Sequence, residues 1–477
     1  MKPWFKTETE SYQMGGRKQK TQKSAYSGKR SAEHGSQPGG FTSIWITEDD
    51  VLTRPAEDGL LGKILDPYNL NRAYLKVCKN GGSYGVDKME VAVLGDYLKS
   101  HGSDLIKTIK AGKFKPNPVR RVEIPKDKHS KRPLGIPTVA DRVLQQSIHQ
   151  VLSPVYEEQF SANSFGFRPG RSTHQALKKC REYISSGYRY AIDMDMAKFF
   201  DTVNHSKLIE VLTRTVKDNR VISLIHKYLN AGVMINGERE ITEQGVPQGG
   251  PLSPLLSNIM LNELDKELTL RGHRFVRYAD DLVILCKSKR GAERVMGSII
   301  KFIEERLYLK VNREKTEVVN YNRIKFLGYS FYKIKEEIRY RIHPKSIAKM
   351  RDKVRELTSR SNGWGNARRK EKLSGFIKGW LNYFKLADMK GLMSRVDEWY
   401  RRRLRMVIWK QWKRVRTRLK NLIKLGINKW KAWEFANTRK SYWRTAGSPI
   451  LSKSVTNDRL KKAGYVFFLD YYLTVKV

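Results

Sequence analysis

The amino-acid sequence predicts an α/β fold for most of this chain of 477 residues. Two short apolar runs, Phe275–Val276 and Leu282–Leu285, flank the tetrapeptide Tyr-Ala-Asp-Asp and are typical of the two arms of a β-hairpin. A second apolar strand is predicted over Tyr190–Met196, and an amphipathic helix follows it at His205–Val216. Strands and amphipathic helices that follow one another in this way indicate the α/β class.

The N-terminal segment and the first strands are predicted from composition and periodicity. Residues 1–58 are polar and rich in Gly, Ser and Lys, and we expect this basic extension to be disordered because it has too little apolar surface to offset the ordering entropy. Val122, Ile124 and the proline-bounded run Leu134–Pro137 predict strands, and Val143–Leu152 predicts the next helix.

The later segments are predicted to be helical. Ser253 and Pro254 suit the N-cap and first turn of a helix whose apolar side carries Leu256, Ile259, Met260, Leu264 and Leu268. A helical stripe with many basic residues is predicted over Lys353–Leu386, where we expect the aromatic side chains to be core rather than binding surface. Asp397–Lys424 is a denser basic segment in which tryptophans are interleaved.

The charge balance predicts a polyanionic partner. Lys and Arg number 93 against 48 Asp and Glu, which gives a formal net charge of +45 and a pI near 10.1. A surplus of this size favours nucleic acid, because each phosphate that is neutralised releases counterions. General solubility is the alternative explanation. A membrane partner is not expected, since no apolar run approaches the roughly 20 residues needed to span a bilayer.

The cysteines exclude two classes of small scaffold. The chain has only Cys78, Cys180 and Cys286, and their spacing indicates neither a disulfide framework nor a zinc cluster. The N-terminus lacks the apolar stretch of a secretory signal, so we expect a bacterial cytoplasmic location.

Acidic residues at the predicted hairpin and strand indicate a metal site. Asp280 and Asp281 are adjacent, and two carboxylates held together repel each other unless a cation lies between them; oxygen ligands suit magnesium. A solvated turn would explain the pair taken alone. Asp193 and Asp195 share one face of the preceding strand. An acid there beside the hairpin pair makes a three-carboxylate site, which can hold two Mg²⁺ ions.

The order of these motifs resembles the palm of reverse transcriptases. The strand acid is followed by Gly245–Gly250, which reads Gly-Val-Pro-Gln-Gly-Gly, then by Tyr-Ala-Asp-Asp, and then by Phe326–Tyr329 after Lys325. The sequence most resembles the group II intron-encoded reverse transcriptase/maturases of bacteria, over roughly residues 66–475. Further blocks that are similar to this family are Leu70–Tyr74, Arg120–Arg142 and Asn163–Arg171.

The resemblance implies a right-hand polymerase with fingers and palm, followed by a helical thumb and a basic C-terminal DNA/RNA-binding region. The implied divisions are the extension 1–58, an N-terminal block with fingers 59–185, the palm 186–338, the thumb or maturase region 339–396, and the nucleic-acid-binding domain 397–477.

The resemblance also assigns roles to residues. Asp195 matches the first catalytic carboxylate and, with Asp280 and Asp281, would bind two Mg²⁺ ions. Asp193 is expected to be a strand residue that is hydrogen-bonded nearby, and Asp201 to cap the next helix. Phe200 would exclude a 2′-hydroxyl by steric clash. The residues implied to contact the dNTP are Arg120, Lys126, Arg132, Phe200, Gln248 and Lys315.

The implied activity is RNA-directed DNA synthesis, combined with a maturase role. The partners would be the group II intron RNA, an RNA template with a DNA primer, target DNA and dNTPs. The residues expected to bind RNA are Arg401, Arg402, Arg403, Arg405, Lys410, Lys413 and Arg414. No cysteine follows Cys286 and no histidine follows His343. We therefore expect no DNA endonuclease domain, which resembles the C-type lineage.

The conformation of one loop is left open, and two alternative functions remain. Tyr308 stands where the family usually has Gly, so the loop there is not predicted. A domesticated reverse transcriptase in phage defence or CRISPR-linked acquisition would keep polymerisation without splicing. A non-catalytic RNA-binding maturase would keep binding without polymerisation, although the intact acidic residues favour an enzyme.

Overall fold

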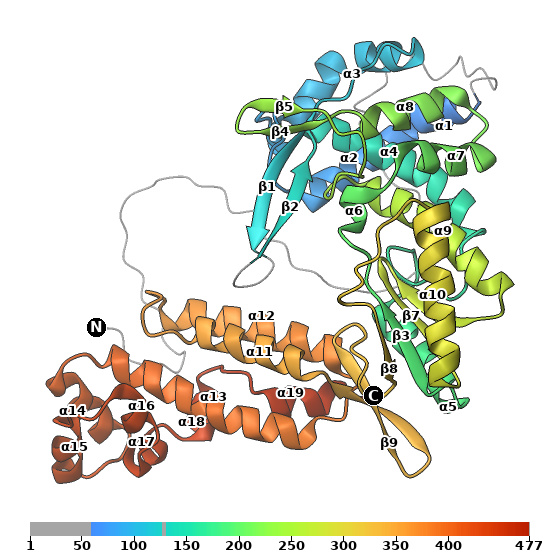
Figure 1. Cartoon of the computed structure of the whole chain (residues 1–477). Coiled ribbons are helices and arrows are strands. Elements are labelled where there is room, and N and C mark those ends of the chain that lie inside the picture. The colour runs from blue at the N-terminus through green and yellow to red at the C-terminus, as the bar shows by residue number, and fades with distance from the viewer. Residues whose placement is uncertain (1–58, 126–129, 477) are drawn as a thin grey trace, which may run out of the picture. The chain divides into compact units, whose positions relative to one another are not determined.

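A computed structural model describes residues 59–125 and 130–476, in two compact units (Figure 1). Among the described residues, the smaller unit contains 354–378 and 394–471, and the larger unit contains the rest. The prediction of a disordered segment at 1–58 lies outside the described residues.

The first part of the larger unit contains several helices and a four-stranded sheet. The strand order of this sheet is β2-β1-β4-β5, where β4 is Val233–Ile235 and β5 is Glu238–Glu240, and β1 runs antiparallel to β2. The first elements are α1 (Gly59–Leu65), α2 (Pro67–Asn80), the 3₁₀ helix η2 (Val91–Val93), α3 (Leu94–Lys110), β1 (Val119–Pro125), β2 (Lys131–Ile136), α4 (Val139–Glu157) and α5 (Thr173–Ser185). The predicted strands and the helix after them are confirmed, with α4 longer at both ends than its apolar pattern suggested.

A second antiparallel sheet contains the acidic motifs. Its order is β6-β7-β3-β8, so the first strand in sequence lies between two later ones. The strands are β3 (Tyr190–Met194), β6 (Arg274–Tyr278), β7 (Asp281–Cys286) and β8 (Glu317–Asn320). Helix α10 (Lys289–Arg306) packs on β3, β7 and β8, whereas α5 and α9 (Ser253–Leu270) contact β6. The predicted hairpin and strand are therefore confirmed.

The remaining elements before Pro344 either connect the two sheets or follow the second one. They are α6 (Phe199–Thr202), α7 (His205–Thr215), α8 (Asn219–Leu229), β4 (Val233–Ile235), β5 (Glu238–Glu240), β9 (Tyr329–Ile334) and β10 (Glu337–Ile342). Strands β9 and β10 pair as a separate antiparallel hairpin.

Apolar side chains from the sheet and its helices form the core. Ile192, Phe275 and Ile284 are fully buried, as is Leu264 of α9. Burying a side chain of this size contributes about 1.5–3 kcal/mol. The core therefore fixes the strand ends on which the acidic residues lie.

Two predicted helix starts are wrong in detail. Asn204, not Asp201, caps α7, because its side chain accepts a hydrogen bond from the amide of Lys207. Asp201 lies inside the short helix α6. The N-cap of α9 is Leu252, and the Ser253 hydroxyl instead donates to the carbonyl of Pro247 at 2.6 Å.

From Pro344 onward the described chain is helical. Its helices are α11 (Pro344–Leu357), α12 (Asn366–Phe384), α13 (Lys390–Gln411), α14 (Val415–Lys424), α15 (Lys429–Ala436), α16 (Tyr442–Ala446), α17 (Pro449–Ser454), α18 (Asn457–Lys462) and α19 (Phe468–Val475). The predicted stripe over Lys353–Leu386 is thus two helices rather than one. The chain turns between them at Gly363, whose φ of +66° favours glycine.

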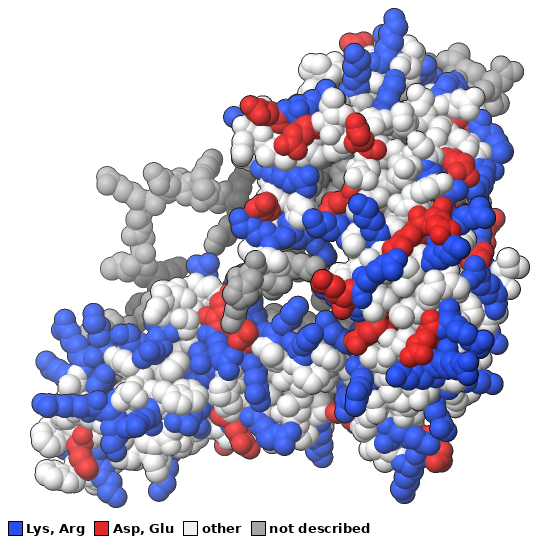
Figure 2. Space-filling view, viewed as in Figure 1, with Lys and Arg blue, Asp and Glu red and all other residues white. Residues whose placement is uncertain are grey.

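The surface of the smaller unit is basic, and the described helices do not suit a bilayer. Figure 2 shows Lys and Arg side chains over much of the face of this unit that the view presents, with few acidic side chains among them. Within residues 59–125 and 130–476, no helix has the length and apolarity to cross a membrane.

Candidate functional site

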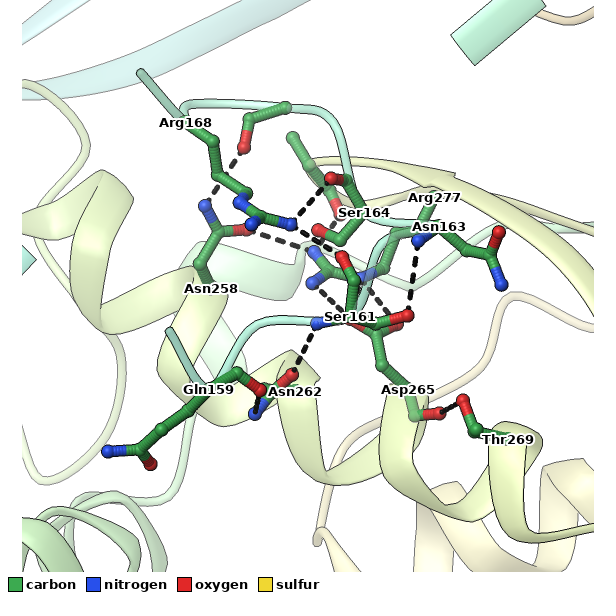
Figure 3. A network of polar contacts seen from close by, with 12 residues as sticks. Gln159, Ser161, Asn163, Ser164, Arg168, Asn258, Asn262, Asp265, Thr269 and Arg277 are labelled. Atoms are coloured by element: carbon green, nitrogen blue, oxygen red, sulfur yellow. Dashed lines mark hydrogen bonds and ion pairs between the residues drawn. The ribbon is translucent and has the colours of Figure 1, made fainter. Parts of the chain in front are cut away.

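A buried ion pair supports the hairpin turn that carries the adjacent acids. Arg277, at the end of β6, and Asp265, on α9, are both fully buried, and an Arg277 nitrogen lies 2.5 Å from an Asp265 oxygen. The same guanidinium donates to Asn258 Oδ1 at 3.0 Å and to the carbonyl of Ala279 at 2.9 Å (Figure 3). Because a buried charge is stable only when it is paired and hydrogen-bonded, this network fixes the position of the turn.

The segment 163–168 lies directly against this turn. The amide of Phe165 donates to the carbonyl of Arg277, and the amide of Arg277 donates to the carbonyl of Asn163, both at 2.9 Å. A Cβ on Gly166 would lie 2.2 Å from the Ala279 nitrogen, so only glycine permits this approach. Ala279 itself has a φ of +56°, a conformation that costs free energy for a residue with a Cβ.

Three acidic residues influence one another at the strand ends. Asp195 directly follows β3, Asp280 lies in the β6–β7 turn with Ala279, and Asp281 is the first residue of β7. Loss of hydration, together with the charges of Asp280 and Asp195, raises the pKa of Asp281 to about 6 against the opposing effect of Lys325 and Arg132. The structure therefore brings all three predicted acids into one electrostatic environment.

Asp193 belongs to the same environment, which the sequence reasoning missed. Burial raises its pKa to about 7, with further contributions from Asp281, Glu317 and Asp195. Asp193 lies within β3, as predicted, and its carboxyl accepts no hydrogen bond from the described residues. The alternation that places Asp193 and Asp195 on one strand face was the available signal.

Cations surround these acids. The Lys315 ammonium lies 3.6 Å from an Asp195 carboxylate oxygen. Lys325 acts on both Asp193 and Asp281. Lys325 was not predicted as a site residue. The available signal was its position directly before the segment Phe326–Tyr329.

The donor set suits magnesium. Within the described residues, no three His, Cys, Asp or Glu side chains are arranged closely enough to enclose a metal ion. The acids at the strand ends nevertheless offer only oxygen ligands, and their mutual repulsion is the condition that a divalent cation relieves. The residues present therefore fit Mg²⁺ by their chemistry.

Two of the predicted nucleotide contacts lie on neighbouring segments, with Phe200 in the helix α6 and Gln248 in the loop before α9. The amide of Val246 donates to the carbonyl of Phe200 at 2.6 Å, and the amide of Gly135 in β2 donates to the carbonyl of Gln248 at 2.8 Å. Gly249 has a φ of +132°, and a Cβ there would lie 2.7 Å from the carbonyl oxygen of Gly135. These contacts bring the segments of Phe200 and Gln248 together beside β2.

The basic residues of the fingers that were predicted to contact the dNTP differ in their surroundings. Arg132 is exposed on β2, and its positive charge opposes the rise in the pKa of Asp281. The Arg120 side chain donates to Ser83 Oγ and to the Tyr84 carbonyl, both at 2.8 Å, and lies over the Tyr84 ring. Lys126 lies outside the described residues.

Several of the arginines predicted to bind RNA make contacts within the protein. Arg402 stacks on Trp443, with the guanidinium 4.2 Å from the ring centroid. Arg405 donates to the carbonyl of Val455 at 2.9 Å. The members of the predicted set that are exposed are Lys410, Lys413 and Arg414, whereas Arg401, Arg402, Arg403 and Arg405 are half-buried on α13.

A strand acid beside a Tyr-Ala-Asp-Asp hairpin in an antiparallel sheet defines a protein of the reverse transcriptase class. The family model "Reverse transcriptase (RNA-dependent DNA polymerase)" matches residues 124–331. The model "Group II intron, maturase-specific domain" matches residues 347–426. The chain belongs to the group II intron reverse transcriptase/maturase family.

Two relatives in bacteria agree with this assignment. Protein YkfC of Escherichia coli is 32% identical over 322 residues, which cover 59% of this chain and 84% of that protein. Group II intron-encoded protein LtrA of Lactococcus lactis is 31% identical over 347 residues, covering 59% of this chain but only 57% of LtrA. A chain in the solved "Partial Cas6-RT-Cas1--Cas2 complex" matches with a TM-score of 0.35 and 25% identity, over 55% of this chain and 44% of that one.

Proposed function

We propose that this protein is an RNA-directed DNA polymerase that also binds its group II intron RNA as a splicing maturase and supports retromobility of the intron. The observation that carries the polymerase proposal is the shared environment of Asp195, Asp280 and Asp281, where the pKa of Asp281 is raised to about 6. The maturase-specific match over residues 347–426 and the net charge of +45 support the RNA-binding part.

In this proposal Asp195, Asp280 and Asp281 would hold two Mg²⁺ ions. Bound magnesium would supply charge that activates the attacking hydroxyl and stabilises the leaving phosphate. The oxygen of a primer 3′-hydroxyl attacks the α-phosphorus of a dNTP and loses its proton to water as the new P–O bond forms, while the bond from the α-phosphorus to the bridging oxygen breaks and pyrophosphate leaves. Lys315, an ammonium 3.6 Å from Asp195, donates a proton to that leaving group.

The other nucleotide contacts follow from side-chain chemistry. Arg132 binds triphosphate oxygens as a forked donor, with Lys126 and Arg120 as further cations. Phe200 excludes the 2′-hydroxyl of a ribonucleotide, and Gln248 lies against the nucleotide and template. The hydrogen bonds that join the Phe200 and Gln248 segments to each other and to β2 support this assignment.

The proposed domains have the boundaries that were predicted from the sequence. Residues 59–185 form the N-terminal block and fingers, 186–338 the palm, 339–396 the thumb and 397–477 the basic C-terminal domain. The RNA template with its DNA primer and the target DNA are the remaining partners. A bacterial cytoplasmic location is part of the proposal, and the C-type lineage stays a prediction.

Primer extension on poly(rA)/oligo(dT) tests the enzyme. We expect the wild type to incorporate dTTP and Asp280→Ala to be inactive while it still binds RNA. An inactive wild type that binds RNA would replace the proposal by the non-catalytic maturase. Sequencing of the RNA that copurifies with the protein tests the intron partner, because a domesticated polymerase would retain no single structured transcript.

A further inference from the structure

A polar pocket in the smaller unit is lined by three arginines. Arg355, Arg360 and Arg403 surround it together with Ser359, Ser361 and Trp443, and its volume is about 340 Å³. It lies among α11, the connection that follows it, α13 and α16. No Asp or Glu is among the described residues that line it, so the pocket presents several donors and no acidic acceptor.

Arg403 anchors the base of the pocket and keeps one nitrogen available. Its Nε donates to Thr358 Oγ1 at 2.5 Å, and its Nη2 donates to the carbonyls of Arg355 and Thr358 at 3.1 and 3.4 Å. Its Nη1 has no hydrogen-bond partner among the residues that the structure describes. A guanidinium fixed in this way is oriented before any ligand arrives, which lowers the entropy cost of binding.

Aromatic rings contact the pocket arginines. The guanidinium carbons of Arg355 and Arg403 lie 5.8 and 5.5 Å from the ring centroid of Trp399. Arg360 lies 5.1 Å from the Tyr442 ring centroid. A ring orients a cation and leaves its net charge in place. The rings beside Arg360 and Arg403 therefore leave the positive charge of these two residues available to an anion.

The electrostatic surroundings of Arg403 favour an anionic ligand. Burial lowers the pKa of its guanidinium, and the charges of Arg355 and Arg360 lower it further. The causes of the shift include no carboxylate, so like charges crowd around a half-buried cation. A bound anion would relieve this repulsion.

We propose that this pocket binds a backbone phosphate of the RNA partner, with Arg360 and Arg403 as forked donors and the Ser359 and Ser361 hydroxyls as additional donors. Arginine is suited to phosphate because its planar fork matches two phosphate oxygens at once. The choice of nucleic acid over a small anion rests on the proposed function and on the basic face of this unit (Figure 2).

Binding of a 20-residue oligouridylate to the full-length protein tests the pocket. Arg360→Gln removes one exposed donor that makes no hydrogen bond within the described protein, so the fold should be unaffected. Loss of one phosphate contact lowers the slope of log affinity against log salt by about 0.7 for a single strand. The matched control is Arg290→Gln, an exposed residue of α10 in the other unit, whose slope should stay at the wild-type value.

A second readout identifies the site directly. Arginine modification by phenylglyoxal, followed by mass spectrometry, should show that oligouridylate protects Arg360 in the wild type. Protection of Arg360 together with the smaller slope supports the pocket. A slope for Arg360→Gln equal to that of Arg290→Gln, or no protection of Arg360, overturns it.

Two comparisons separate the pocket from the wider function. Wild-type protein that fails to bind oligouridylate contradicts the proposed RNA-binding function itself. Binding that survives with no contribution from Arg360 contradicts only the pocket. An oligothymidylate of equal length tests DNA: equal slope losses support recognition of the phosphate alone, and a loss confined to DNA overturns the assignment to RNA.

Discussion

Gly166 lies directly against the acidic turn, and its replacement by alanine tests the proposed site. The added Cβ would lie 2.2 Å from the Ala279 nitrogen and 2.8 Å from the Tyr278 carbonyl carbon. Ordinary contacts begin at 3.4 Å, so the turn or the segment 163–168 must move by about 1.2 Å. Both atoms that would clash are backbone atoms, and no flexible side chain can absorb the change.

The consequence should be large for catalysis and moderate for stability. A 1 Å misplacement at a reacting centre costs roughly 10²-fold in rate. This corresponds to about 2.7 kcal/mol of activation free energy, at 1.36 kcal/mol for each factor of ten. We therefore expect Gly166→Ala to slow primer extension about 100-fold, since Asp280 and Asp281 follow the displaced Ala279 directly.

The assay is single-turnover dTTP incorporation on poly(rA)/oligo(dT), with circular dichroism and urea unfolding as measures of fold. Gly297→Ala is the matched control, because Gly297 is exposed on α10 and a Cβ there meets nothing within 4 Å. That change should leave the rate unaltered and stabilise the helix by up to about 1 kcal/mol. A Gly166→Ala enzyme that is folded and as fast as the wild type would refute the link between this turn and catalysis.

Three further predictions concern single side chains. Asp280→Ala should abolish incorporation yet keep RNA affinity within about twofold, because one of 48 acids is lost from a strongly basic chain; a residual rate near wild type contradicts the metal assignment. Arg277→Met should lower the free energy of unfolding by about 3–5 kcal/mol in urea, since it leaves Asp265 buried without its partner, and adding Asp265→Leu should restore much of that loss; two independent, additive losses would contradict the pairing. Burial lowers the pKa of His149 to about 4, so its neutral form stabilises the fold above pH 6.5, and lowering the pH from 7 to 5 should cost about 2 kcal/mol that a His149→Gln protein does not lose; equal pH profiles of unfolding would contradict this.

The conformation of the loop at Tyr308 was not predicted from the sequence and is known only from the structure. Tyr308 stands where the family usually has glycine, and its φ is +54°. The tyrosine therefore adopts the left-handed conformation that glycine takes easily, and its side chain is exposed.

Local patterns were sufficient for the elements that carry the acids. The alternation in Tyr190–Met196 and the two apolar arms around Tyr-Ala-Asp-Asp predicted β3, β6 and β7, because a half-buried or buried strand imposes its own periodicity on the sequence. The net charge of +45 predicted a polyanionic partner in the same way, since charge is a property of composition.

Tertiary structure alone decided which distant residues meet. Asp265 and Arg277 pair because α9 packs on β6. Glu317 lies beside the acids because β8 pairs with β3, which places Glu317 opposite Asp193, and Lys325 lies in the segment after β8. Neither pairing has a sequence spacing that predicts it. The arginine pocket depends likewise on helices brought together by packing, so the sequence indicated Arg403 as an RNA contact but did not place Arg355 and Arg360 beside it. Periodicity records which face of an element is buried, but it does not record which partner covers that face, and the geometry of a site depends on that partner.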